Sequence, residues 1–284
     1  MILNASGCLD ALTAPAVAQQ LDAFVAKTVT LEPRQGNEPP RLAETDHGML
    51  NSIGLQNPGI ERFSAEVLPH LEKLGVPLWA SVGGTEASDY REVCSRLARF
   101  DSIVSIELNL SCPNVDLAAG SASEIVAACR EVTSKPLYAK LSPVLPDIAR
   151  VALAVRGAGA DGLSLVNSLR GLALDERTLR PRLGRAVGGY SGAALRPVAL
   201  AAVYTCYAAT QGEMPIVGMG GVESGRHALD LVACGASAIA LGSVLLSDPD
   251  APARIRAELA CELDTREFAA LEQARGAAHR PAER

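Results

Sequence analysis

Segment 105–116, SIELNLSCPNVD, places reactive side chains directly after a predicted strand. Apolar and polar residues alternate over 106–110, which is the period of two expected of a strand. Pro113 then prevents the backbone from continuing a hydrogen-bonded ladder, and Cys112 and Asn114 stand on either side of it. A thiolate at a strand end acts as a nucleophile or as a proton acceptor. Because the sequence shows no His–Asp pair placed to activate Cys112 as a nucleophile, we predict that it transfers a proton.

The remaining cysteines and the four histidines show no metal-binding pattern. There is no C-x-x-C pair and no histidine spacing such as H-x-x-x-H, so we predict no protein-bound metal. An odd number of cysteines, seven, indicates mostly reduced thiols in a cytoplasmic chain. Six of them are expected to be small buried hydrophobes: Cys8, Cys94, Cys129, Cys206, Cys234 and Cys261.

Several other predicted strand exits are polar. Lys27 and Lys140 are expected to point into a common mouth, where a lysine pairs with phosphate, forms a Schiff base or stabilises negative charge on a flavin ring, unless it only forms a plain ion pair. The glycine-rich exits at 218–221 and 241–243 suit a phosphate, unless they are only tight turns. Converging amides would bind a small polar heterocycle, although turn chemistry also explains asparagine. The asparagines concerned are Asn51, Asn57, Asn109, Asn114 and Asn167.

Eight strands alternating with helices are needed to position these residues. The strands are predicted at 2–5, 23–29, 77–82, 103–108, 137–141, 162–166, 215–218 and 238–241. The helices are predicted at 14–21, 61–74, 86–99, 122–132, 148–158, 194–208, 225–233 and 249–263. This order predicts an α/β fold, a (β/α)8 TIM barrel forming one domain over 1–263, with active-site loops at the C-terminal ends of the strands. Residues 264–284 are expected to form a polar C-terminal tail or helix. The long segments 30–59 and 169–192 are expected to be lids or binding loops.

Composition excludes some classes of partner. The 284 residues carry a formal net charge of −6 with a pI near 5.3, so neither nucleic acid nor an anionic membrane is expected to bind. The start, MILNASGC, lacks the features of a signal peptide, which favours a cytoplasmic location. The longest apolar run, 229–246, contains glycine, serine and aspartate and fits a helix end followed by a buried strand better than a membrane span.

A series of motifs resembles class 1 dihydroorotate dehydrogenases. They are NASG, KTVTLEPRQGNEPPR, GMLNSIGLQNPG, ELNLSCPNV, KLSP, GADGLSLVNS, GGYSG, IVGMGGV and ALGS, and they occur in the order seen in that family. The similarity runs from Asn4 to about Pro249. KLSP alone is weak, but NSIGLQNPG together with NLSCPN and GMGGV is highly specific.

The resemblance implies an FMN-bearing barrel that oxidises dihydroorotate to orotate in pyrimidine biosynthesis. It implies that Cys112 is the base that removes the C5 proton, while C6 delivers hydride to flavin N5 on the other face. Lys27 would lie near both substrate and flavin, and Lys140 near the N1/O2 edge of the flavin, where positive charge stabilises the reduced ring. The other implied substrate ligands are Asn51, Asn109, Asn114, Asn167 and Ser168. The other implied cofactor contacts are Asn109 and the backbone of Ala5, Ser6, Gly192, Gly220, Gly221, Gly242 and Ser243.

The same motifs indicate the branch of the family. Cys112 stands where the membrane-linked class 2 enzymes carry serine, and SIGLQNPG, KLSP and GMGGV are most similar to the class 1B catalytic subunit. Class 1B implies a partner subunit with FAD and an iron–sulfur cluster, and NAD rather than fumarate as acceptor. The family also implies a homodimer of barrels. The chain begins at the first predicted strand, without the hairpin that relatives carry before NASG, so we expect either a different barrel floor or a start further upstream.

Three alternative functions remain open at this point. A dihydropyrimidine-type reductase is similar, but its motif tends to continue SCPH, so Asn114 argues against it. A phosphate-binding aldolase with Lys140 as a Schiff-base amine would leave Cys112 and the amides unexplained. A non-catalytic barrel subunit would bind no flavin.

Overall fold

Eight parallel strands form the central sheet of the protein. The computed structural model describes residues 1–110 and 119–281. Neighbouring strands follow the order β1-β12-β11-β8-β7-β6-β5-β2, and an isolated bridge between Leu3 and Ala23 nearly closes the barrel. The strands are β1 (Ile2–Asn4), β2 (Phe24–Val25), β5 (Leu78–Val82), β6 (Ile103–Asn109), β7 (Leu137–Leu141), β8 (Gly162–Leu165), β11 (Ile216–Met219) and β12 (Ala238–Leu241). The predicted (β/α)8 fold is confirmed.

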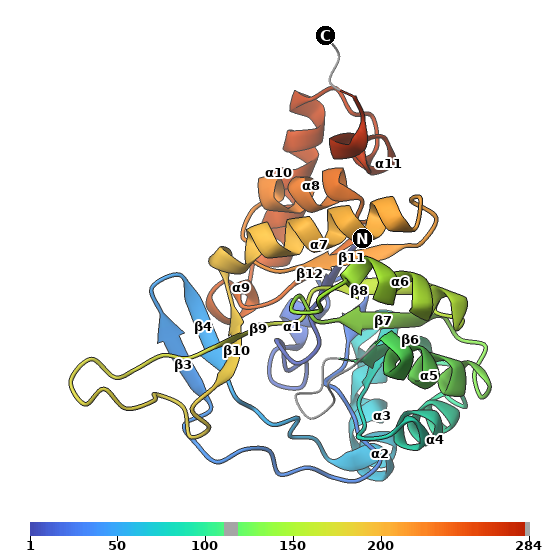
Figure 1. Cartoon of the computed structure of the whole chain (residues 1–284), viewed down its shortest axis with the longest axis vertical. Coiled ribbons are helices and arrows are strands. Elements are labelled where there is room, and N and C mark those ends of the chain that lie inside the picture. Colours follow the sequence, from blue (N-terminus) through green and yellow to red (C-terminus); the bar gives the residue numbers. More distant parts are fainter. Residues whose placement is uncertain (111–118, 282–284) are drawn as a thin grey trace.

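Helices follow the strands and cover the outside of the barrel (Figure 1). They are α1 (Pro15–Ala18), α2 (Gly59–Arg62), α3 (Leu68–Leu71), α4 (Ala87–Leu97), α5 (Ala119–Arg130), α6 (Ile148–Gly157), α7 (Arg196–Ala209), α8 (Gly225–Cys234), α9 (Val244–Ser247), α10 (Ala251–Thr265) and α11 (Leu271–Ala274). The apolar run 229–246 divides between α8 and β12, as predicted. Within the described ranges, every helix is too short or too polar to cross a membrane.

The seam between β1 and β2 is held by one side chain. Asn4 is completely buried, and its amide reproduces the hydrogen bonding of a peptide group. Its Nδ2 donates to the Val25 carbonyl at 2.8 Å, and its Oδ1 accepts from the Val25 N–H at 2.8 Å. Since both strands are short, this pair of bonds replaces part of the ladder that they lack. The asparagine of NASG is therefore a structural residue of the barrel.

Replacing Asn4 by alanine is expected to destabilise the protein. The substitution leaves the buried N–H and C=O of Val25 without their partner, and each unsatisfied group costs about 1–3 kcal/mol. We expect a loss of about 2–5 kcal/mol in the free energy of unfolding, measured by urea denaturation. An exposed hydroxyl, Thr13, provides the control, because Thr13→Ala removes only a surface hydrogen bond. Equal stabilities of the two variants would contradict the role given to Asn4.

The barrel interior is narrow and filled near its floor. Trp79 and Tyr138 lie with ring centroids 4.5 Å apart, surrounded by small and branched residues of the other strands. Gly162 faces the Tyr138 ring so closely that a Cβ there would lie 2.3 Å from the ring. A larger apolar cluster fills the space between the strands and the helices. Asn109 and Lys140 lie nearer the carboxyl ends of their strands than these two rings.

The two long segments predicted as lids or loops pair with each other. They form an antiparallel sheet of order β3-β4-β10-β9, with β3 (Leu42–Thr45), β4 (Gly48–Asn51), β9 (Leu169–Gly171) and β10 (Gly188–Ser191). Between β9 and β10 the chain projects away from the barrel (Figure 1). Gly189 lies opposite Asn51 in this sheet, and a Cβ on it would lie 2.2 Å from the Ser168 Oγ. Glycine here allows Ser168 and Asn51 to approach each other.

The end of the chain packs against α7 and α8. Arg275 donates hydrogen bonds to the carbonyls of Gly235, Gly212 and Met214, and His279 stacks on Tyr204 with ring centroids 3.8 Å apart. The described part of the tail predicted at 264–284 thus consists of the end of α10, the short helix α11 and a 3-10 turn at Ala277–His279.

Candidate active site

A cavity of about 1160 Å³ opens at the carboxyl ends of the strands. All site residues implied by the family resemblance that the structure describes line this cavity, and the small antiparallel sheet forms part of its wall. They are Ala5, Ser6, Lys27, Asn51, Asn109, Lys140, Asn167, Ser168, Gly192, Gly220, Gly221, Gly242 and Ser243. Cys112 and Asn114 lie outside the described residues. Residues from distant parts of the chain therefore meet in one place.

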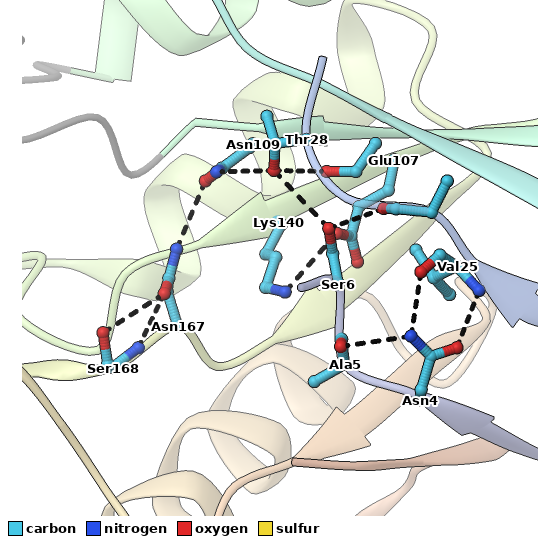
Figure 2. A network of polar contacts seen from close by, with 12 residues as sticks. Asn4, Ala5, Ser6, Val25, Thr28, Glu107, Asn109, Lys140, Asn167 and Ser168 are labelled. Atoms are coloured by element: carbon cyan, nitrogen blue, oxygen red, sulfur yellow. Dashed lines mark hydrogen bonds and ion pairs between the residues drawn. The ribbon is translucent and has the colours of Figure 1, made fainter. Parts of the chain in front are cut away.

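Five polar side chains form a continuous hydrogen-bonded chain across the cavity (Figure 2). Asn167 donates through Nδ2 to the Asn109 Oδ1 at 3.2 Å, and Asn109 donates to the Thr28 hydroxyl at 3.3 Å. The Thr28 and Ser6 hydroxyls are 3.5 Å apart. At the other end, the Ser168 N–H donates to the Asn167 Oδ1 at 2.8 Å. Each amide is oriented by its neighbour, so the array is preorganised before a ligand binds.

Buried hydroxyl groups next to this array fix its position. The hydroxyl of Tyr90 on α4 donates to the Asn109 carbonyl at 2.8 Å, and the Thr28 and Ser81 hydroxyls lie 3.0 Å apart. Tyr90 and Ser81 are each about 1% exposed. Asn109 ends β6, and these contacts hold that strand end in place. An amide held by helix, strand and neighbour together is suited to read one edge of a planar heterocycle.

Lys140 forms a buried ion pair inside the barrel. Its Nζ lies 3.4 Å from the Glu107 Oε1, and the side chains are 8% and 2% exposed (Figure 2). Lys140 stands beside Asn109 on one neighbouring strand and beside Ser164 on the other. The Ser164 hydroxyl is buried and has no hydrogen-bond partner among the described residues. Lys140 and Ser164 therefore lie between the aromatic rings of the barrel floor and the cavity.

Lys27 has no ion-pair or hydrogen-bond partner within the described residues. Its side chain packs against Gly7, where a Cβ would lie 2.8 Å from the Lys27 Nζ. Burial lowers the pKa of Lys27; the nearby Cys8 opposes this change, and the positive charge of Lys140 adds to it. Burial raises the pKa of the Cys8 thiol, with the two lysines opposing. An anionic ligand near Lys27 would oppose this lowering of its pKa.

The glycine-rich strand exits have the backbone geometry of a phosphate site. Gly220 and Gly221 have φ of +127° and +69°, and a Cβ on Gly221 would lie 2.9 Å from the carbonyl oxygens of Ala193 and Gly192. Only glycine can take this path. Within the described residues the N–H groups of Gly221 and Ser243 donate no hydrogen bond, and both residues line the cavity. Such free N–H groups are the donors that a phosphate binds.

The charge of the cavity is opposite to that of the whole chain. Its described lining has one carboxylate, Asp147, whereas the chain has a net charge of −6. The cationic lining residues are Lys27, Lys140, Arg150, Arg170 and Arg185. This asymmetry favours anionic ligands at this end of the barrel.

Two expectations about individual residues are corrected. Asn57 does not line the cavity, because its amide bonds to backbone and side-chain groups of Thr30, Leu55 and Gly59 and stabilises a turn. The expectation of six buried cysteines is also wrong: Cys8 and Cys234 are half-buried and Cys261 is exposed. Cys8 follows the strand exit NASG directly and therefore lines the cavity.

Other site residues were missed in the sequence. Glu107 was seen only as one polar position of a strand, although a polar face on a barrel strand must point inward, away from the apolar helices. Thr28 belongs to the polar strand exit Lys27-Thr28, but the sequence assigns it no role in the site. Arg170 and Arg185 are the first and last residues of the arginine-rich stretch RGLALDERTLRPRLGR, for which the sequence suggests only a solvated loop. Their place at the cavity depends on the pairing of β9 with β10.

Comparisons with known proteins agree with this site. The family model described as dihydroorotate dehydrogenase matches residues 1–263. The catalytic subunit of dihydroorotate dehydrogenase B (NAD(+)) from Desulforudis audaxviator is 43% identical over 267 residues, which cover 92% of this chain and 86% of that protein. The protein of the same name from Listeria welshimeri is 41% identical over 261 residues, with coverages of 89% and 85%.

A solved structure supports the fold independently. The crystal structure of DHODH in complex with ferulenol from Eimeria tenella superimposes with a TM-score of 0.83. The alignment covers 99% of this chain and 85% of that chain at 24% sequence identity, so it is informative about the architecture alone.

The fold is that of a TIM-barrel enzyme, and its candidate active site is a cationic, amide-lined cavity at the carboxyl ends of the strands. Within that class, the family match and the identity to curated relatives show that the chain belongs to the dihydroorotate dehydrogenases, flavin-dependent oxidoreductases of pyrimidine biosynthesis. The predicted family and activity are confirmed. This result favours dihydroorotate oxidation over the reductase, aldolase and non-catalytic alternatives.

Proposed function

We propose that the chain oxidises dihydroorotate to orotate with FMN bound in the cavity described above. The observation that carries this proposal is the convergence of the implied substrate and cofactor residues on one cationic cavity in a chain of this family. When bound, FMN supplies the two-electron acceptor for the hydride from C6. The free N–H groups of Gly221 and Ser243 would bind its phosphate.

The residues of the chain divide the remaining work. Asn51, Asn109, Asn167 and Ser168 would bind and orient the dihydropyrimidine ring, with Asn114 completing the set. Lys27 would attract the anionic substrate, and Lys140 would stabilise negative charge on the cofactor. Cys112 would accept the C5 proton. A weakly acidic C–H benefits from a positioned base and from hydrogen-bond donors to the developing enolate, which the amide array provides.

The electron acceptor follows from the relatives. Their names describe catalytic subunits of an NAD(+)-linked enzyme, so we propose that a partner subunit with FAD and an iron–sulfur cluster carries electrons from this barrel to NAD. Co-purification with such a subunit should be required for NAD reduction; NAD reduction by the barrel alone would contradict this. The homodimer and the cytoplasmic location stay predictions.

The test of the proposed function is anaerobic reduction of the cofactor by the substrate. The protein, purified in the presence of FMN, is expected to retain it through gel filtration and to lose its visible flavin absorbance when dihydroorotate is added. Protein without dihydroorotate is the control. Failure to retain FMN, or flavin that stays oxidised with excess dihydroorotate, would overturn the proposal.

A further inference from the structure

The two lysines of the cavity differ in their surroundings. Lys27 has no carboxylate partner among the described residues, whereas the Lys140 Nζ lies 3.4 Å from the Glu107 Oε1. Both lysines line the cavity, but Glu107 does not, so the carboxylate lies behind the ammonium group as seen from the ligand side. The difference follows from strand register. On the neighbouring strands Glu107 lies opposite Tyr138 and Lys140 lies opposite Asn109, so the carboxylate comes from one inward position below the ammonium group.

Stability does not explain a buried ion pair at this position. Desolvation of two charges usually offsets their attraction, and well-packed apolar side chains in their place are often as stabilising or more so. The layer below already uses such packing, with Trp79 against Tyr138. A charged pair directly beneath the ligand cavity is therefore better explained by an effect on the ligand.

We propose that Glu107 is a positioning residue that holds the Lys140 ammonium at the cofactor and offsets part of its charge, which lowers the electron affinity of the flavin. This inference rests on FMN binding as given under the proposed function. Without this compensation, the positive charges of both lysines would stabilise the reduced flavin strongly. It would then pass on its electrons less readily. Glu107 thus reduces the effective positive charge of Lys140, whereas the full charge of Lys27 stays available to bind the anionic substrate.

The test compares the flavin reduction equilibrium in charge-changing and charge-keeping variants. Glu107→Gln removes the charge and keeps an acceptor for Lys140, and Glu107→Met removes it with a side chain of similar length. Both are expected to shift the equilibrium with a reference dye about tenfold toward reduced FMN, about 30 mV for two electrons. Glu107→Asp keeps the charge, and Ser105→Ala changes the same inward face two residues earlier without a charge. For both of these control variants, the equilibrium constant with the reference dye should stay within about twofold of the wild-type value.

The outcomes separate this inference from the proposed function. Wild-type protein that binds no FMN, or whose FMN is not reduced by dihydroorotate, overturns both. Wild-type protein that passes that test while the two neutral variants show no shift, or a shift toward oxidised FMN, overturns the role of Glu107 alone. Failure of both neutral variants to fold, shown by circular dichroism, also overturns it, because Glu107 would then serve stability.

Discussion

Cys112→Ala is expected to retain FMN and to lower kcat for dihydroorotate oxidation by about 10²–10⁴-fold, the usual contribution of a positioned general base. The remaining machinery is expected to stay in place, because Tyr90 and Ser81 hold the amide array through hydrogen bonds that do not involve position 112. Rapid mixing of the FMN-loaded variant with dihydroorotate under anaerobic conditions measures the effect on the chemical step.

A second substitution at the same position sharpens this prediction. Cys112→Ser should also be slow, because a hydroxyl needs a different environment to accept a proton. Cys261→Ala is the matched control, since Cys261 is an exposed thiol on α10. Rates for Cys112→Ala equal to those of the Cys261 variant would show that another group is the base.

Lys140→Ala is expected to destabilise the protein by about 3–5 kcal/mol, because it leaves the carboxylate of Glu107, 2% exposed, buried without its partner. The loss should appear in urea denaturation without added FMN, so that it reports on the fold rather than on the cofactor. The same variant is expected to reduce FMN slowly with dihydroorotate, since negative charge on the cofactor is no longer stabilised.

The double variant Lys140→Met/Glu107→Met distinguishes a charge effect from a packing effect. Removing both charges eliminates the unpaired carboxylate, and apolar replacement of a buried ion pair is often neutral. We expect the double variant to recover most of the stability that Lys140→Ala loses. Equal instability of the single and double variants would mean that the Lys140 side chain matters through its packing.

The sequence predicted the barrel because each strand and helix is a local pattern. Short runs rich in β-branched residues alternate with stretches of helical period, and polar or glycine residues follow the strands. Parallel strands in a barrel place all these exits at one end, so Lys27, Asn109, Lys140 and Asn167 had to meet. The family motifs then narrowed the chemistry to dihydroorotate oxidation.

The features that were not predicted depend on contacts between distant residues. β4 and β10 are about 140 residues apart in sequence, and nothing within either segment shows that they pair. The pairing of β9 with β10 brings Arg170 and Arg185 to the cavity. The ion pair between Glu107 and Lys140 could not be predicted, because it depends on the register of β6 against β7. The residue ranges of the strands do not give that register. Asn57 is the opposite case. Its residue type suggested a ligand-binding amide, but its hydrogen bonds stabilise a turn.

The most direct test of the account is a crystal structure of the FMN-loaded protein with orotate. The account predicts that orotate lies between the flavin and the thiol, with the Cys112 Sγ in van der Waals contact with C5 on the face turned away from FMN. Asn109 and Asn167 should donate to the ring. A Cys112 side chain directed away from the bound orotate, or orotate bound outside the cavity at the strand ends, would contradict it.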